Sequence, residues 1–104
     1  MWNKTKYDLV RIHQNSINVS EAGHFREYVD EIIEQGGTHL IIDLSELQAI
    51  GSISIGVLFS ITKKIRERDG DFQIIGASPV VMEMLKLSKI DQIIEVHQKG
   101  ESSP

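Results

Sequence analysis

The sequence has no cysteine, only two prolines and a single tryptophan in its 104 residues. Without cysteine the chain forms neither disulfide bonds nor the thiolate sites that hold structural zinc. No apolar run approaches the roughly 18 residues that a membrane-spanning helix needs, and the first residues lack the apolar core of a signal peptide. We therefore expect a soluble, cytoplasmic protein with no membrane span.

An excess of positive charge is also missing. The net charge is −4 and the sequence pI is about 5.5, which argues against nucleic acid as a partner because a phosphate backbone requires a basic surface. The one basic cluster, residues 63–68, falls where a helix is predicted to end, and cations there complement the helix dipole. The four histidines lack the short spacings of metal ligands: His13, His24, His39 and His97. We expect neither a metal nor a cofactor.

Strands and helices alternate along the chain. Branched apolar runs bounded by turn residues predict strands at 7–13, 39–44, 72–76 and 93–96, and a very short one at 17–19. Apolar residues at helical spacing predict helices at about 20–35, 53–68 and 79–88. This alternation implies right-handed crossovers and a largely parallel sheet. We predict an α/β fold: a single layer of four or five mostly parallel strands, with an N-terminal strand or short hairpin, packed against three or four helices.

The length fits one domain, which we place at residues 1–97. Residues 98–104 have no apolar side chain to bury, and we expect them to form a disordered tail. Capping residues mark the helix starts: residues 18–21 have the spacing of a capping box, with Asn18 or Ser20 as the cap. Ser78 followed by proline predicts the start of the last helix.

A turn with two serines joins the predicted strand 39–44 to the helix that follows it. It contains Gly51, Ser52, Ile53 and Ser54. Ligands and partners of parallel α/β sheets usually meet the protein at the carboxyl ends of strands, and a helix start there supplies free N–H groups and a positive dipole end. Gly56 costs about 1 kcal/mol inside a helix, so we expect close packing or backbone access to explain it. We predict that this turn is the functional site.

Catalytic patterns are missing from the same region. Residues 51–56 are one residue too long for a nucleophile elbow, and no glycine-rich run ends in the lysine of a phosphate-binding loop. Asp43, at the end of a strand, is a candidate metal ligand or phosphoacceptor, but aspartate more commonly orders the loop that follows it. We expect a binding protein rather than an enzyme.

The residues around this turn resemble the core motif of the STAS domain family of bacterial anti-sigma factor antagonists. The motif has an apolar strand, Asp-Leu-Ser at 43–45, and a serine turn at 50–58 that leads into a helix. Residues 70–81 and 85–94 resemble the next strand with its helix cap and the closing segment of the family. The resemblance extends over residues 9–97, in order and at the expected spacing, and implies the STAS fold.

The resemblance also implies a mechanism in which the first serine of the motif, here Ser52, is phosphorylated. Family members bind a partner that is both an anti-sigma factor and a serine-protein kinase, phosphorylation releases that partner, and a serine phosphatase resets the switch. Ser54 is a rival phosphoacceptor. We expect the partner-binding surface to comprise Asn18, Val19, Ser20, Gly51, Ser52, Ile53, Ser54 and Gly56. A homodimer is compatible with this arrangement.

Three positions depart from the family pattern, and they leave other roles open. Gly51 replaces an acidic or amide residue, Ile53 replaces a second hydroxyl, and Ser54 replaces a glycine. These departures favour the alternative of a STAS scaffold or transport-complex subunit that is not phosphorylated. A small enzyme or ligand-binding protein that uses the same turn is a third hypothesis. Ser52 also has a purely structural alternative as a helix N-cap, worth about 1 kcal/mol.

Overall fold

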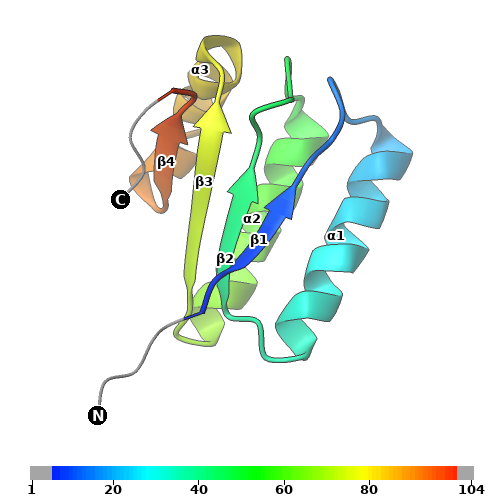
Figure 1. Cartoon of the computed structure of the whole chain (residues 1–104), viewed down its shortest axis with the longest axis vertical. Coiled ribbons are helices and arrows are strands. Elements are labelled where there is room, and N and C mark those ends of the chain that lie inside the picture. The colour runs from blue at the N-terminus through cyan, green and yellow to red at the C-terminus, as the bar shows by residue number, and fades with distance from the viewer. Residues whose placement is uncertain (1–5, 101–104) are drawn as a thin grey trace.

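The computed structural model describes residues 6–100. Four strands alternate with three α-helices (Figure 1), and a short 3-10 turn, η1, precedes the last strand. The elements are β1 (Asp8–Arg11), α1 (Val19–Glu34), β2 (His39–Asp43), α2 (Ser52–Glu67), β3 (Asp71–Ala77), α3 (Pro79–Ser88), η1 (Ile90–Gln92) and β4 (Glu95–Gln98). Within these residues, no helix has both the length and the apolar character needed to cross a membrane.

The strands form one sheet in the order β1-β2-β3-β4, and every neighbouring pair is parallel. Each helix therefore begins at the carboxyl edge of the sheet, which lies at the top of Figure 1. This architecture confirms the predicted α/β fold, with four strands, three α-helices and a single N-terminal strand instead of a hairpin. The predicted short strand at 17–19 is wrong, because Asn18 caps α1 and Val19 is already its first residue.

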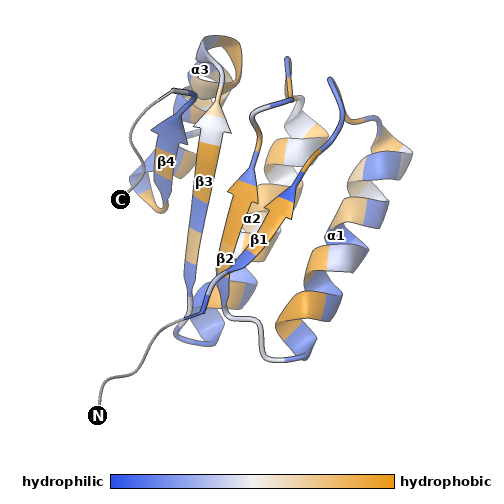
Figure 2. Ribbon diagram, viewed as in Figure 1, coloured by the Kyte–Doolittle hydropathy of each residue, from blue (hydrophilic) through white to orange (hydrophobic). Residues whose placement is uncertain are grey.

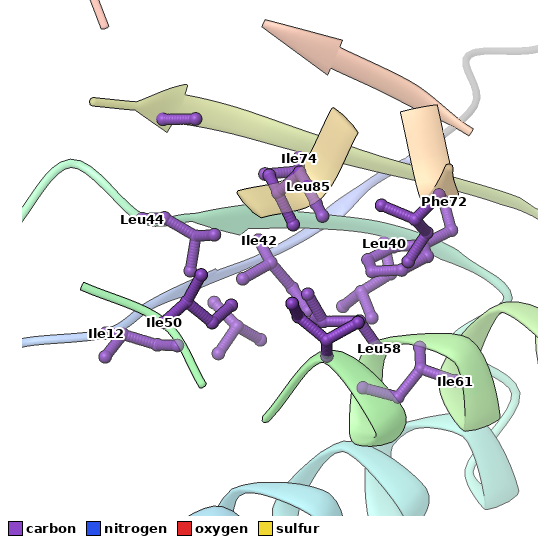
Figure 3. Packing of buried hydrophobic residues seen from close by; sticks show 14 of the residues in the cluster. Ile12, Leu40, Ile42, Leu44, Ile50, Leu58, Ile61, Phe72, Ile74 and Leu85 are labelled. Carbon is purple, nitrogen blue, oxygen red and sulfur yellow. The ribbon is translucent and has the colours of Figure 1, made fainter. Parts of the chain in front are cut away.

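The core lies between the sheet and the helices, as the close view in Figure 3 shows. In β2, Leu40 and Ile42 point into it, and Ile41 between them faces the other side of the sheet and is only half-buried. The residues of α2 that repeat at helical spacing form a face that is buried throughout: Ile55, Leu58, Ile61, Thr62 and Ile65. Burying a side chain the size of leucine or isoleucine contributes about 1.5–3 kcal/mol, so this face fixes α2 against the sheet.

The helices cover one face of the sheet. In Figure 2, β1 and β2 are coloured mainly as hydrophobic, and hydrophobic and hydrophilic residues alternate along the helices. On the opposite face Leu9 is exposed and Gln73 is half-buried. In α1, apolar residues at helical spacing form a stripe in which Val29 and Ile33 are buried but Tyr28 is exposed. The stripe is therefore narrower than its spacing indicates.

The carboxyl end of the chain differs from the prediction. Lys89 adopts a left-handed conformation (φ 66°) that ends α3, and η1 uses residues 90–92 before β4 begins. β4 thus starts at Glu95, two residues later than predicted, and it includes Gln98. The backbone N–H of Lys99 donates to Ala77 O at 2.7 Å, so residues 98 and 99 join the sheet and are not part of a disordered tail. Residues 101–104 of that predicted tail lie outside the described residues.

Candidate functional site

α2 begins without a side-chain cap. Gly51 occupies the N-cap position in an extended conformation (φ −102°, ψ 174°), and its carbonyl accepts the first helical hydrogen bond, from Ile55 N at 3.1 Å. Ser52 is the first residue of the helix, so the hypothesis that it serves as the N-cap is wrong. No acidic residue lies in the first turn. The N–H groups of this turn and the positive end of the helix dipole are therefore not neutralised by α2 itself.

The two serines of the turn differ in their accessibility. Ser52 is exposed, and its hydroxyl has no hydrogen-bond partner among the residues of the structure from 6 to 100. Ser54 is only 7% exposed, because two residues along a helix turn a side chain by about 200°. Ser52 is the hydroxyl that another protein can reach, and burial removes Ser54 from that surface.

The remaining residues predicted for the partner surface are all exposed. In α2, Ile53 is 53% exposed, and Gly56 faces open space, since a Cβ built there meets no atom within 4 Å. The expectation of close packing at Gly56 is therefore wrong, and access to its backbone is the explanation that fits. In α1, Val19 is 66% exposed. Asn18 and Ser20, on either side of it, are exposed as well.

The loop after β1 and the loop after β2 run beside each other at the carboxyl edge. His13 Nδ1 lies 2.8 Å from Glu46 Oε2, and the N–H of Gln48 donates to Asn15 O at 2.8 Å. These two contacts hold the segment before α1 against the segment before α2. Within residues 6–100, no hydrogen bond or ion pair joins Ser52 directly to residues 18–20. Sequence analysis missed these links; the shared edge of two parallel strands was the signal that could have revealed them.

Asp43 orders the loop that leads to the site. Its buried carboxylate accepts hydrogen bonds from Ser45 N at 2.8 Å and from Arg11 Nε at 2.9 Å. Burial alone would raise the pKa of Asp43, but the bonds from Ser45 and Arg11 outweigh it and hold this pKa below its ordinary value. Gly76 approaches so closely that a Cβ there would lie 2.8 Å from Asp43 Oδ1. The predicted loop-ordering role is confirmed.

The chemistry available to Ser52 follows from these contacts. A catalytic serine is activated by a hydrogen-bonded base, whereas the Ser52 hydroxyl has no such partner in the described part of the chain. In the same range, no group of three or more His, Asp or Glu side chains could hold a metal ion. The arrangement suits an acceptor: an exposed hydroxyl beside uncapped N–H groups, where an added phosphate is locally stabilised.

Comparison with known proteins gives consistent results. The STAS domain family model matches residues 5–102. A Thermotoga maritima protein named as an anti-sigma factor antagonist is 29% identical over 92 residues, which cover 86% of this chain and 81% of that protein.

Solved structures have the same arrangement of strands and helices. The crystal structure of a T. maritima anti-sigma factor antagonist superposes with a TM-score of 0.77 at 28% identity, over 86% of this chain and 79% of that one. The anti-sigma factor antagonist SpoIIAA, in its unphosphorylated form, superposes with a TM-score of 0.77 over 92% of this chain and 84% of that one. At 15% identity the second match shows the fold alone.

Proposed function

Because this chain belongs to the STAS domain family, we propose that it is a phosphorylation-controlled partner switch in the cytoplasm of a bacterium. Unphosphorylated, it binds an anti-sigma factor that is also a serine-protein kinase, and the sigma factor is released. Phosphorylation of Ser52 by the same partner ends the complex, and a serine phosphatase restores the binding form. In this role the protein is a binding module and carries out no catalysis.

The names of its relatives support the choice of partner. The T. maritima protein is named as an anti-sigma factor antagonist, and the same description applies to the solved T. maritima structure.

One observation carries the proposal: Ser52 is an exposed hydroxyl on the first residue of an uncapped helix, next to the exposed side chain of Ile53. A phosphate adds about −1.5 to −2 charge at neutral pH. The helix start tolerates that charge while the chain is free. Within a complex the phosphate would have to be desolvated at the interface, which is costly for an unpaired charge. Phosphorylation therefore changes the binding surface and leaves the fold unchanged.

The departures at positions 51, 53 and 54 favour a second candidate, a STAS scaffold or transport-complex subunit without phosphorylation. Gly51 offers a kinase no side chain before the acceptor, and Ile53 offers no second hydroxyl. Ser54 is buried and does not replace that hydroxyl on the surface. The exposed Ser52 hydroxyl can still be phosphorylated by a kinase that recognises the backbone and shape of this turn, without neighbouring side chains.

The test begins with purified chain, ATP and each purified anti-sigma factor kinase of the source organism, with phosphate located by mass spectrometry. We expect modification of Ser52, none in Ser52→Ala, and normal modification in Ser54→Ala as the matched control. Ser52→Asp should lose binding to the modifying kinase, and Ser52→Ala should keep it. Absence of phosphate with every kinase, or phosphate elsewhere while Ser52→Asp binds normally, contradicts the proposal and favours the scaffold.

A further inference from the structure

All three helices present an exposed aliphatic side chain at their start. Val19 is the first residue of α1, Ile53 the second of α2 and Val80 the second of α3, and they are 66%, 53% and 56% exposed. Parallel strands place all three helix starts at the carboxyl edge, seen together at the top of Figure 1. Val80 was not among the predicted partner-binding residues, although the helical spacing of Val81 and Leu85 predicts that Val81 faces the core and Val80 does not.

The same edge is built from segments without charge. The chain has 11 basic and 15 acidic residues, yet none falls in residues 12–20, 47–62 or 72–82. These segments contain the loop and first residues of α1, the start and first half of α2, and the end of β3 with the start of α3.

Three acidic side chains near these segments have partners, whereas Glu83, directly after the third segment, is exposed. Asp43 is buried against Arg11, and Glu46 is paired with His13. Glu21 closes the capping box of α1. The exposed edge therefore offers mainly aliphatic and uncharged polar groups, with few charges beside them: Glu83 after the start of α3, and Lys99, whose Nζ donates to Ser45 O at 3.0 Å.

We propose that the partner-binding surface extends beyond Ser52 across the starts of all three helices, including Val80, and that it receives an uncharged, apolar face of the kinase. This inference rests on the proposed function and names the chemistry of the partner's face. Depletion of charge with retained apolar side chains is typical of the core of a protein interface. An uncharged face of the kinase suits this surface, because a charged side chain of the kinase would lose its water there without gaining a partner.

The proposal also explains how one phosphate controls binding. On a surface with few other charges, phosphate at Ser52 is the dominant charge, and the complex can form only if that group is desolvated. Release then depends on desolvation of the phosphate and not on repulsion from an acidic partner. A second copy of this chain is a less suitable occupant, since such a dimer would cover Ser52 and hide it from the kinase.

The test titrates the kinase that modifies Ser52 with wild type, Val80→Glu, Val80→Lys and the matched control Leu87→Glu. Leu87 lies on the same helix and is 70% exposed, but it is near the end of α3 and away from the carboxyl edge. We expect both Val80 variants to weaken binding by at least about tenfold, because either charge would be buried, and the control to stay within about twofold. Thermal unfolding checks that all variants are folded.

Salt dependence provides a second readout. For an uncharged interface we expect the Kd of the unphosphorylated form to change less than about threefold between about 50 and 500 mM NaCl. Opposite effects of Val80→Glu and Val80→Lys, or steep weakening by salt, would show a charged partner face and overturn the inference.

Two further outcomes separate this inference from the proposed function. Normal binding by both Val80 variants, with binding lost in Ser52→Asp, overturns the extended surface and leaves the switch intact. A dimer in sedimentation that Val80→Glu dissociates assigns the surface to a second copy, which also overturns the inference. No kinase binding by wild type overturns the proposed function itself.

Discussion

α1 and α2 begin at the same edge of the sheet but in different ways. At the start of α1, Asn18 Oδ1 accepts from Glu21 N at 2.8 Å, and Glu21 Oε1 accepts from Asn18 N at 2.9 Å. The second carboxylate oxygen of Glu21 accepts a hydrogen bond from Gln14. At the start of α2, Gly51 supplies no side chain, and the first turn contains no acidic residue.

This difference separates a helix start that is capped by its own side chains from the one that we propose as the functional site. A capping box satisfies two backbone N–H groups reciprocally, so the start of α1 has fewer free N–H groups than the start of α2 and already holds a carboxylate. The start of α2 has no such intramolecular partner. Its position depends instead on the buried face of the helix and on the loop before it, which Asp43 anchors.

The largest effect should come from removing that anchor. Asp43→Ala deletes the acceptor for Ser45 N–H and Arg11, and hydrogen bonds to a charged group contribute about 1.5–3 kcal/mol. We expect the free energy of unfolding to fall by about 2–3 kcal/mol, measured by urea denaturation. Asp43→Asn, which keeps one acceptor oxygen, should lose less. Equal stability of wild type and Asp43→Ala would show that the loop needs no anchor.

Acid should remove the same contribution from wild type. Because the pKa of Asp43 is lowered by folding, its stabilisation is complete above the ordinary aspartate value of 3.8 and is lost as pH falls through the lower folded value. The difference in unfolding free energy between wild type and Asp43→Ala should therefore shrink as pH falls below 3.8. Asp71 also has a lowered pKa, and its contribution cancels in this difference. A constant difference across that range would contradict the assignment.

The two helix starts should respond differently to loss of their polar side chains. Asn18→Ala removes the cap of α1 and should cost about 1 kcal/mol, whereas Ser52→Ala removes a hydroxyl with no partner and should change stability by less than about 0.5 kcal/mol. Thermal unfolding of both variants measures the contrast. Similar losses in the two variants would mean that Ser52 contributes to the fold as well.

Gly56→Ala should separate stability from binding. A Cβ at this position meets nothing within 4 Å, and alanine is favoured over glycine inside a helix by about 1 kcal/mol. We expect a gain in unfolding free energy of about 0.5–1 kcal/mol together with weaker binding to the kinase, because the added methyl group stands on the partner-facing backbone. Phe59, one turn further along α2, provides a control: Phe59→Leu should leave binding unchanged. A stabilised variant with normal binding would place Gly56 outside the interface.

Sequence patterns predicted this fold because its strands and helices carry strong local signals. The buried face of α2 repeats at helical spacing, Asn18 and Ser78 act as caps as predicted, and two glycines precede the apolar run of β2. The site was predicted less completely. Spacing alone does not show that Gly51 takes the N-cap position in place of Ser52.

Tertiary contacts account for the rest. The ties between the loops join residues 33 positions apart, His13–Glu46 and Asn15–Gln48, and no local pattern reports them. The start of β4 was missed because η1 depends on a left-handed residue, Lys89, whose conformation its residue type does not favour. The sequence was enough to propose the carboxyl edge as the functional side, but which side chains are exposed there depends on packing.

The smallest effect is expected from giving α2 a side-chain N-cap like that of α1. Gly51 is extended and a Cβ there meets nothing within 4 Å, so Gly51→Asn and Gly51→Asp should fit and cap the helix. Because glycine is itself a tolerable N-cap, we expect a gain of only a few tenths of a kcal/mol, larger for Asp through the dipole. Thermal unfolding at matched ionic strength measures this gain.

These caps also allow a test of whether charge at Ser52 interacts with the helix start. The measurement is the effect of Ser52→Glu on the free energy of unfolding, with and without a cap at position 51. In the wild-type background Ser52→Glu should be neutral or stabilising, because a carboxylate at an uncapped helix start meets free N–H groups. With Asp at 51 those groups are occupied and a like charge is adjacent, so the same substitution should become unfavourable by about 0.5 kcal/mol or more; with Asn at 51 the change should be smaller. If Ser52→Glu changes the free energy of unfolding equally in all three backgrounds, charge at Ser52 does not interact with the N–H groups of α2. The uncapped start of this helix would then not stabilise a phosphate.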